Sequence, residues 1–146
     1  NHHVGQVECS KHVQFSVVVN PKGVVSGWGN VFLAHENTND FPDVFGLFFF
    51  DQSLKMRAWV NWRYFQAGLP HCDVEDPLPL NEDTVVVLRL SGGEVNVLFN
   101  GTVVCTNSNY GDDTGMGEGV MDVWASSDAH NAADAVISNL VYTVLP

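Results

Sequence analysis

The chain has 146 residues, 45% of them hydrophobic, which is enough apolar material for a core of its own. Six Lys and Arg residues against 17 Asp and Glu residues give a formal charge of −11, which repels a nucleic-acid backbone and an anionic membrane surface. No segment approaches the roughly 20 apolar residues of a membrane span. We therefore expect one domain over residues 1–146, with no nucleic-acid partner and no membrane insertion.

The chain begins Asn-His-His-Val, without an initiator Met or the apolar region of a signal peptide, so we interpret it as already processed. The Asn1 amine, the next two amide nitrogens and the His3 imidazole could form a square-planar copper or nickel site. A frayed terminus with two exposed histidines is the favoured interpretation. Asn100-Gly101-Thr102 fits the glycosylation sequon, which favours a secreted, extracellular glycoprotein. A tight turn would also require this Asn-Gly pair.

Apolar residues alternate with period two in the long apolar segments, and no segment has a convincing helical stripe. This pattern predicts an all-β protein with very little helix. The expected strands, in chain order, are 12–20, 28–35, 44–50, 54–65, a meander over 84–106, 120–125 and 136–144. Residues 66–81 contain three prolines and a glycine and are predicted to be a long loop.

Two hairpin turns, at 92–93 and 100–101, fix the register of the meander. Ser91 should lie opposite Glu94, and Phe99 opposite Thr102. The core face then carries Val86, Leu88, Leu90, Val95, Val97, Phe99 and Val104. The outer face carries Val85, Val87, Arg89, Asn96, Leu98, Val103 and Cys105. Because that outer face is so apolar, we expect a cover: the loop with Cys72, the N-terminal segment with Cys9, or a second subunit.

The three cysteines allow one disulfide and leave one thiol over. The predicted register places Cys105 on the outer face of the meander, and Cys72 lies in a long loop able to fold over that face. We therefore expect the disulfide Cys72–Cys105. Cys9 would then be unpaired or would link two chains in a homodimer.

The predicted strand 54–65 contains the most informative surface row. Its even positions are apolar and should face the core, so the outward row consists of Lys55, Arg57, Trp59, Asn61 and Arg63. An exposed indole among fixed hydrogen-bonding groups suits a sugar, and three cations would also suit an acidic glycan. The alternative is a solvated strand face that only prevents aggregation.

Two polar segments add candidate residues. The turn with His35, Asn37 and Asn39 is dense in hydrogen-bonding groups and follows a strand end, although turn chemistry alone would explain such a composition. The acidic loop with Asp112, Asp113 and Glu118 could bind calcium, or it could be an ordinary exposed loop without EF-hand spacing. We expect no other cofactor.

Several segments together resemble a known superfamily: the strand ending at Asn20-Pro21, the Val97-x-Phe99-Asn100-Gly101 hairpin, and the tail from Val123-Trp124-Ala125-Ser126 to Asn139-Leu140. They are similar to the concanavalin A-like jelly roll of laminin G modules, pentraxins and galectins. The resemblance covers about residues 13–144 and implies a two-sheet antiparallel sandwich.

The galectin sugar signature, His-x-Asn-x-Arg, matches at His35 and Asn37 but has Asn39 in place of its Arg. The later Trp-x-x-Glu-x-Arg element is missing, so this sequence is not expected to be a true galectin. The paired-carboxylate motif of jelly-roll glycosidases and the nucleophile elbow are also missing, so no enzyme is expected. We expect a secreted, lectin-like carbohydrate-binding module; the alternative is an extracellular structural or adhesive protein that self-assembles without sugar.

Overall fold

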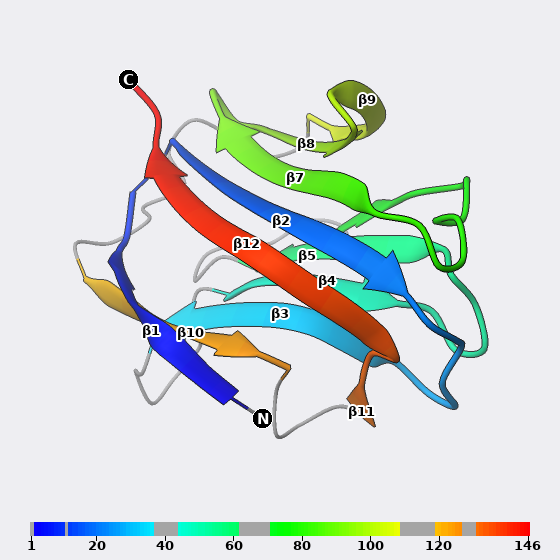
Figure 1. Ribbon diagram of the computed structural model, residues 1–146. Helices are drawn as coiled ribbons and strands as arrows, with labels where there is room; N and C mark the ends of the chain where they lie inside the picture. Colours follow the sequence, from blue (N-terminus) through cyan, green and yellow to red (C-terminus); the bar gives the residue numbers. More distant parts are fainter. Residues whose placement is uncertain (1, 11, 37–43, 62–70, 109–118, 127–130) are drawn as a thin grey trace.

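The computed structural model describes residues 2–10, 12–36, 44–61, 71–108, 119–126 and 131–146 (Figure 1). All regular secondary structure in these segments is β-strand, which confirms the all-β prediction. None of the described segments forms a helix that is long and apolar enough to cross a membrane.

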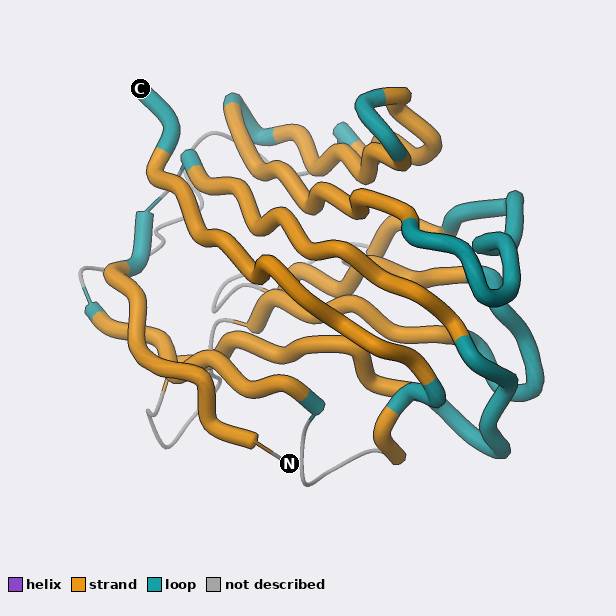
Figure 2. The backbone as a smooth tube through the Cα atoms, viewed as in Figure 1, coloured by secondary structure: helices purple, strands orange, loops and turns teal. Residues whose placement is uncertain are grey.

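The strands form two sheets that pack face to face (Figures 1 and 2). Sheet A has the order β1 (His2–Glu8), β10 (Val120–Ala125), β3 (Gly29–Glu36), β4 (Val44–Phe49), β5 (Met56–Asn61) and β6 (His71–Asp73), with β11 (Asn131–Ala132) beside β3. Sheet B has the order β12 (Ala135–Val144), β2 (Val13–Pro21), β7 (Thr84–Ser91), β8 (Glu94–Phe99) and β9 (Thr102–Asn107). Neighbouring strands are antiparallel, except that β11 runs parallel to β3.

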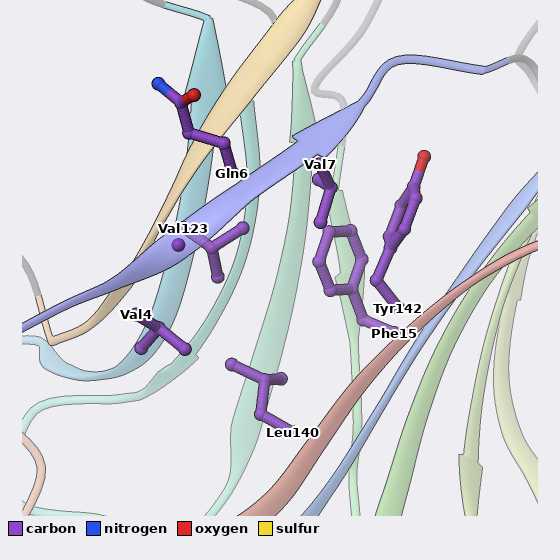
Figure 3. A pocket seen from close by; sticks show the side chains of 8 residues that line it. Val4, Gln6, Val7, Phe15, Val123, Leu140 and Tyr142 are labelled. Carbon is purple, nitrogen blue, oxygen red and sulfur yellow. The ribbon is translucent and has the colours of Figure 1, made fainter.

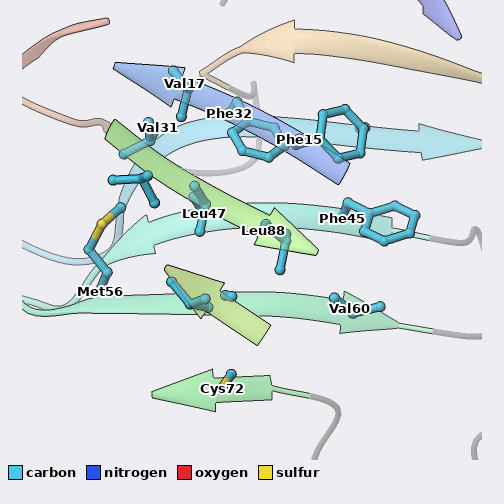
Figure 4. Packing of buried hydrophobic residues seen from close by; sticks show 14 of the residues in the cluster. Phe15, Val17, Val31, Phe32, Phe45, Leu47, Met56, Val60, Cys72 and Leu88 are labelled. Atoms are coloured by element: carbon cyan, nitrogen blue, oxygen red, sulfur yellow. The ribbon is translucent and has the colours of Figure 1, made fainter. Parts of the chain in front are cut away.

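The core lies between the two sheets, and β2 shows why this sequence forms it. Its residues alternate between buried and half-buried, as the period-two pattern predicts. Phe15 of β2 packs its ring 5.0 Å from that of Phe32 and 5.5 Å from that of Phe45, which both belong to sheet A (Figure 4). Each fully buried side chain of this kind contributes roughly 1.5–3 kcal/mol of hydrophobic stabilisation.

Besides the two-residue β11, two strands lie where none was expected. The N-terminal segment, predicted to be frayed, forms β1 and pairs with β10 along the edge of sheet A. The predicted loop 66–81 contains β6, in which Cys72 is buried and pairs with Ala58 of β5. Both strands lie at the edges of sheet A, where a short or weakly alternating sequence can still pair on one side.

The meander has the predicted turns, with Ser91 opposite Glu94 and Phe99 opposite Thr102. A β-bulge then shifts the register, so that Val97 pairs with Cys105 instead of Val104. As a result Val104 and Cys105 both pack against the core. The prediction that Cys105 faces outward is therefore wrong.

The disulfide Cys72–Cys105 has the predicted partners but a different geometry. It joins the edge strand β6 of sheet A to the edge strand β9 of sheet B across the interior. The strand that contains Cys72 therefore extends one edge of sheet A, and β1 extends the other. Val85 and Val103 on the outer face of the meander remain 40% and 53% exposed.

Candidate functional site

The candidate site lies on the outer face of sheet A, the face turned away from sheet B. In β5 the side chains of Met56, Ala58 and Val60 are fully buried in the core. Arg57 and Trp59 therefore project from the opposite face, as the alternation predicts. Trp59 is 38% exposed, which is unusual for so large an apolar ring.

Cross-strand pairing places Trp59 in a row that runs across the sheet, here called the tryptophan row. Trp124 of β10 pairs with Leu33 of β3, Leu33 with Gly46 of β4, Gly46 with Trp59, and Trp59 with His71 of β6. Neighbouring strands lie about 4.8 Å apart, so three strand spacings separate the two tryptophans by about 14 Å.

An aromatic cluster forms the floor beside the middle of the row. A Cβ atom on Gly46 would lie 2.6 Å from Cε2 of Phe48, so only glycine allows the Phe48 ring to lie over this position. Trp28 packs edge-on against Phe48 with 6.4 Å between ring centroids, and its ring lies 4.9 Å from that of Phe50. This part of the outer face is thus fixed by aromatic packing.

Arg57 is held on top of that cluster. Its guanidinium carbon lies 5.1 Å from the ring centroids of both Trp28 and Phe50. Its Nε and Nη2 donate to the two carboxylate oxygens of Asp73 in β6, at 2.6 and 2.7 Å. Such a bidentate pair fixes both side chains, so Arg57 is a rigid part of the surface rather than a mobile cation.

His71 lies next to this ion pair at the end of the tryptophan row. Its Nε2 is 3.6 Å from Oδ2 of Asp73. Burial lowers the pKa of His71, the positive charge of Arg57 lowers it further, and the Asp73 carboxylate opposes both effects. At neutral pH the imidazole is therefore neutral and offers one donor and one acceptor.

The opposite end of the row is organised around Trp124. The His3 ring of β1 lies 4.8 Å from the Trp124 ring. Next to it, Asp122 accepts a hydrogen bond from Gln6 at 2.9 Å. When His3 Nε2 carries the proton, it donates a second bond to Asp122 at 3.0 Å. The hydrogen bond from Gln6 lowers the pKa of Asp122 most, and the bond from His3 lowers it further, so this carboxylate stays ionised.

The structure brings together only part of the predicted ligand set. Arg57 and Trp59 share the outer face, and His35 of β3 lies on the same face in register with Asp122. Lys55 lies just before β5, with Nζ 3.4 Å from the Glu75 carboxylate. Asn61 ends β5, but its side chain lies outside the described part of the chain, as do Asn37, Asn39 and Arg63.

Sequence reasoning missed four contributors to this face: Trp28, His71, Asp73 and Trp124. Trp124 had a readable signal, because Met121 and Val123 are buried and the alternation of β10 turns Asp122 and Trp124 outward. His71 and Asp73 had none, since they lie in a three-residue strand within a Pro-rich segment.

The predicted calcium site lies outside the described residues, whereas the predicted glycosylation site lies within them. Asp112, Asp113 and Glu118 lie outside the described residues, so calcium binding there stays a prediction. Among the described residues, no three His, Cys, Asp or Glu side chains gather closely enough to hold a metal ion. Asn100 is exposed in its turn with φ of 48°, and its Oδ1 accepts from the Val85 amide at 2.9 Å. The turn itself therefore uses this asparagine.

No protein-family model matches the chain, and no curated protein matches it in sequence. Solved structures do match its fold. A native heptameric SAP-like pentraxin from Limulus polyphemus matches with a TM-score of 0.62 and 14% identity, over 99% of this chain and 70% of the pentraxin chain. Sheep galectin-11, in complex with glycerol, matches with a TM-score of 0.59 and 12% identity, over 98% of both chains.

Enzymes are also among the structural neighbours. A Trypanosoma rangeli sialidase matches with a TM-score of 0.60 and 14% identity, over 90% of this chain but only 20% of the sialidase. The fold therefore does not decide whether the protein is an enzyme. At such low identity these likenesses show the architecture alone: the chain has the concanavalin A-like jelly-roll fold that its sequence resembles.

Proposed function

We propose that the protein is a secreted carbohydrate-binding module that holds a glycan against Trp59 on the outer face of sheet A. The observation that carries the proposal is the setting of this indole. Trp59 is 38% exposed, and the Arg57–Asp73 pair and His71 lie in fixed positions beside it.

Sugar recognition requires both parts of that setting. The CH face of a pyranose stacks on an indole, while its hydroxyl groups need donors and acceptors at fixed positions. Asp73 is an acceptor, Arg57 a donor, and neutral His71 can act as either. Because the Arg57–Asp73 pair is already formed without ligand, less side-chain freedom is lost when the glycan binds.

The charges of this face favour a neutral glycan over an acidic one. A preference for an acidic glycan would require cations without a carboxylate partner, but Arg57 is paired with Asp73 and Lys55 with Glu75. Arg63, the third cation of the predicted row, lies outside the described residues. A sulfate or carboxylate on the glycan would have to compete with the carboxylates that the protein already supplies.

The tryptophan row also indicates the length of the ligand. Trp59 and Trp124 are about 14 Å apart, too far for one sugar ring to touch both. Leu33 and the aromatic floor over Gly46 connect them. The proposed ligand is therefore an oligosaccharide that lies across the strands.

Secretion is supported by the disulfide and by the position of Asn100. Structural disulfides form and persist in oxidising compartments, and Cys72–Cys105 ties the two sheets together. Asn100 is exposed at a hairpin turn, where its side chain can be reached from solvent.

Glycan-array binding of wild type, Trp59→Ala and Trp59→Phe tests this function. We expect binding of a neutral oligosaccharide to wild type, at least a tenfold loss in Trp59→Ala, and retention in Trp59→Phe, which keeps an aromatic face. Val103→Ala, on the outer face of sheet B, is the matched control for truncating an exposed apolar residue. Binding that is the same in Trp59→Ala and wild type would reject this site. Repeating the wild-type array with a chelator tests whether glycan binding depends on calcium.

A second candidate function is self-assembly of an extracellular structural or adhesive protein through the outer face of sheet B. The supporting observation is a group of exposed valines on that face, Val85, Val103, Val136 and Val141. Sedimentation over a wide concentration range should then show dimers or larger species, and Val141→Lys should remove them. A monomer at every concentration would reject this alternative.

A further inference from the structure

A cavity of about 190 Å³ lies between the two sheets at the edge formed by β1 and β12. Figure 3 shows its walls: Val4 and Val7 come from β1, Val123 from β10, Phe15 from β2, and Leu140 and Tyr142 from β12. The cavity is thus walled by core-facing side chains of both sheets and opens to solvent at this edge, where Val4 is 50% exposed. It lies on the side of sheet A opposite to the tryptophan row.

The cavity exists because β1 has a glycine where a core side chain would otherwise stand. Gly5 pairs with Val123, whose side chain points into the sandwich, so a side chain on residue 5 would point the same way. A Cβ atom built on Gly5 meets no heavy atom within 4 Å. The register shift between His3 and Gly5 leaves Val4 as the extra residue of the bulge.

The side chains of the lining offer few polar groups to an occupant. Gln6 points to the other face of β1, where its Nε2 donates to Asp122 (Figure 3). The Tyr142 hydroxyl is engaged, because it donates to the Glu8 carbonyl. Burial, together with Cys9 and Glu8, raises the pKa of Tyr142 to about 12, so this phenol stays neutral.

Water is a poor occupant of such a space. An ordered water needs two to four polar partners, which these side chains do not supply, and an apolar space of about 150 Å³ is large enough for benzene. The present cavity is slightly larger and has an aromatic wall, since the Phe15 and Tyr142 rings lie 4.9 Å apart. We propose that this slot between β1 and β12 binds one small, neutral, apolar molecule about the size of a single aromatic ring.

Benzene is the probe for this site, with methyl NMR spectra of the full chain as the readout. We expect saturable shifts confined to methyl groups of the lining, Val4, Val7, Val123 and Leu140. Gly5→Val should reduce benzene affinity at least tenfold, because its side chain occupies the space. It should also raise the melting temperature without benzene, since the cavity is filled. Ser138→Val, which adds an exposed valine on the outer face of β12, is the control and should bind as wild type does.

Leu140→Phe, which fills the slot from sheet B, is the second variant in case Gly5→Val disturbs β1. The proposal is overturned if the wild-type methyl groups show no saturable shift, or if both filling variants bind benzene as wild type does. Ordered water in the slot, seen as water-to-methyl cross-relaxation in the absence of benzene, would also overturn it. None of these results depends on glycan binding, so the two proposals fail or succeed separately.

Discussion

The outer faces of the two sheets both expose apolar side chains, but they are built differently. On sheet A, Trp59 lies beside an ion pair and an aromatic cluster whose members contact one another. On sheet B, the exposed apolar residues are valines such as Val103 and Val141, and none of the large exposed apolar side chains among its described residues is aromatic. The polar side chains of that face bond one another, as Arg89 does with Gln14 at 3.0 Å. Hydrophobic area alone is non-directional, whereas aromatic faces combined with fixed polar groups give specificity. The first face is suited to a defined ligand, and the second to packing against another surface.

The largest effect should come from removing the bond that connects the two sheets at their edges. Cys72→Ser combined with Cys105→Ser should lower the free energy of unfolding by roughly 3–4 kcal/mol, from the loop entropy that the disulfide removes. Glycan binding should weaken too, because Cys72 lies between His71 and Asp73 in the short strand β6. Urea denaturation measures the first effect and the glycan array the second. A loss below about 1 kcal/mol would contradict this account of the disulfide.

The two outer faces should respond differently to one additional or missing small group. Gly46→Ala places a methyl group 2.6 Å from the Phe48 ring, so the ring must move and unfolding should become easier by about 1–3 kcal/mol. Ser16→Ala on the outer face of β2 should change stability by less than about 0.5 kcal/mol. Thermal denaturation compares both with wild type. Equal stability of Gly46→Ala and wild type would show that the aromatic floor is loosely packed.

The smallest effect concerns the pH dependence of the β1 end of sheet A. The pKa of Asp122 is lowered in the folded state by the bonds from Gln6 and His3, so its contribution is present above its unfolded pKa, about 4. That contribution is lost as the pH falls through the folded value. Asp122→Asn should therefore melt below wild type at neutral pH, and the difference should shrink below about pH 4. Melting temperatures from pH 7 to 2 test this, and a constant difference would contradict it.

Much of the fold could be predicted because alternation reports burial directly. The β10 segment was predicted with its observed bounds, and the hairpin turns gave the correct pairing of Ser91 with Glu94. The bulge at Val104 could not be predicted, since one inserted residue leaves no mark in a Val-rich strand. That bulge alone turned Cys105 from the expected outer face to the core, so the right disulfide was predicted for the wrong geometric reason.

The candidate site was less predictable than the fold. Trp59 and Arg57 could be found because they share one strand with a regular pattern. Asp73 and Trp124 could not be placed beside them, because strand order within a sheet is not written in the spacing of residues along the chain. The pairing of Arg57 could not be predicted for the same reason, because its carboxylate partner Asp73 comes from another strand.

The pairing of the two chain ends determines when the sandwich can close. Strand β1 pairs with β10, which lies far along the chain. Similarly β2 needs β12 at one edge, although β7, which is nearer in sequence, can cover its other edge earlier. Within the described residues, two-residue turns join sequence neighbours only in the meander β7–β8–β9. The fold is therefore dominated by non-local contacts, which predicts slow folding. Until β12 is available, the Val-rich edge of β2 is exposed to other chains, so newly made protein is most prone to aggregation before this ten-residue strand emerges.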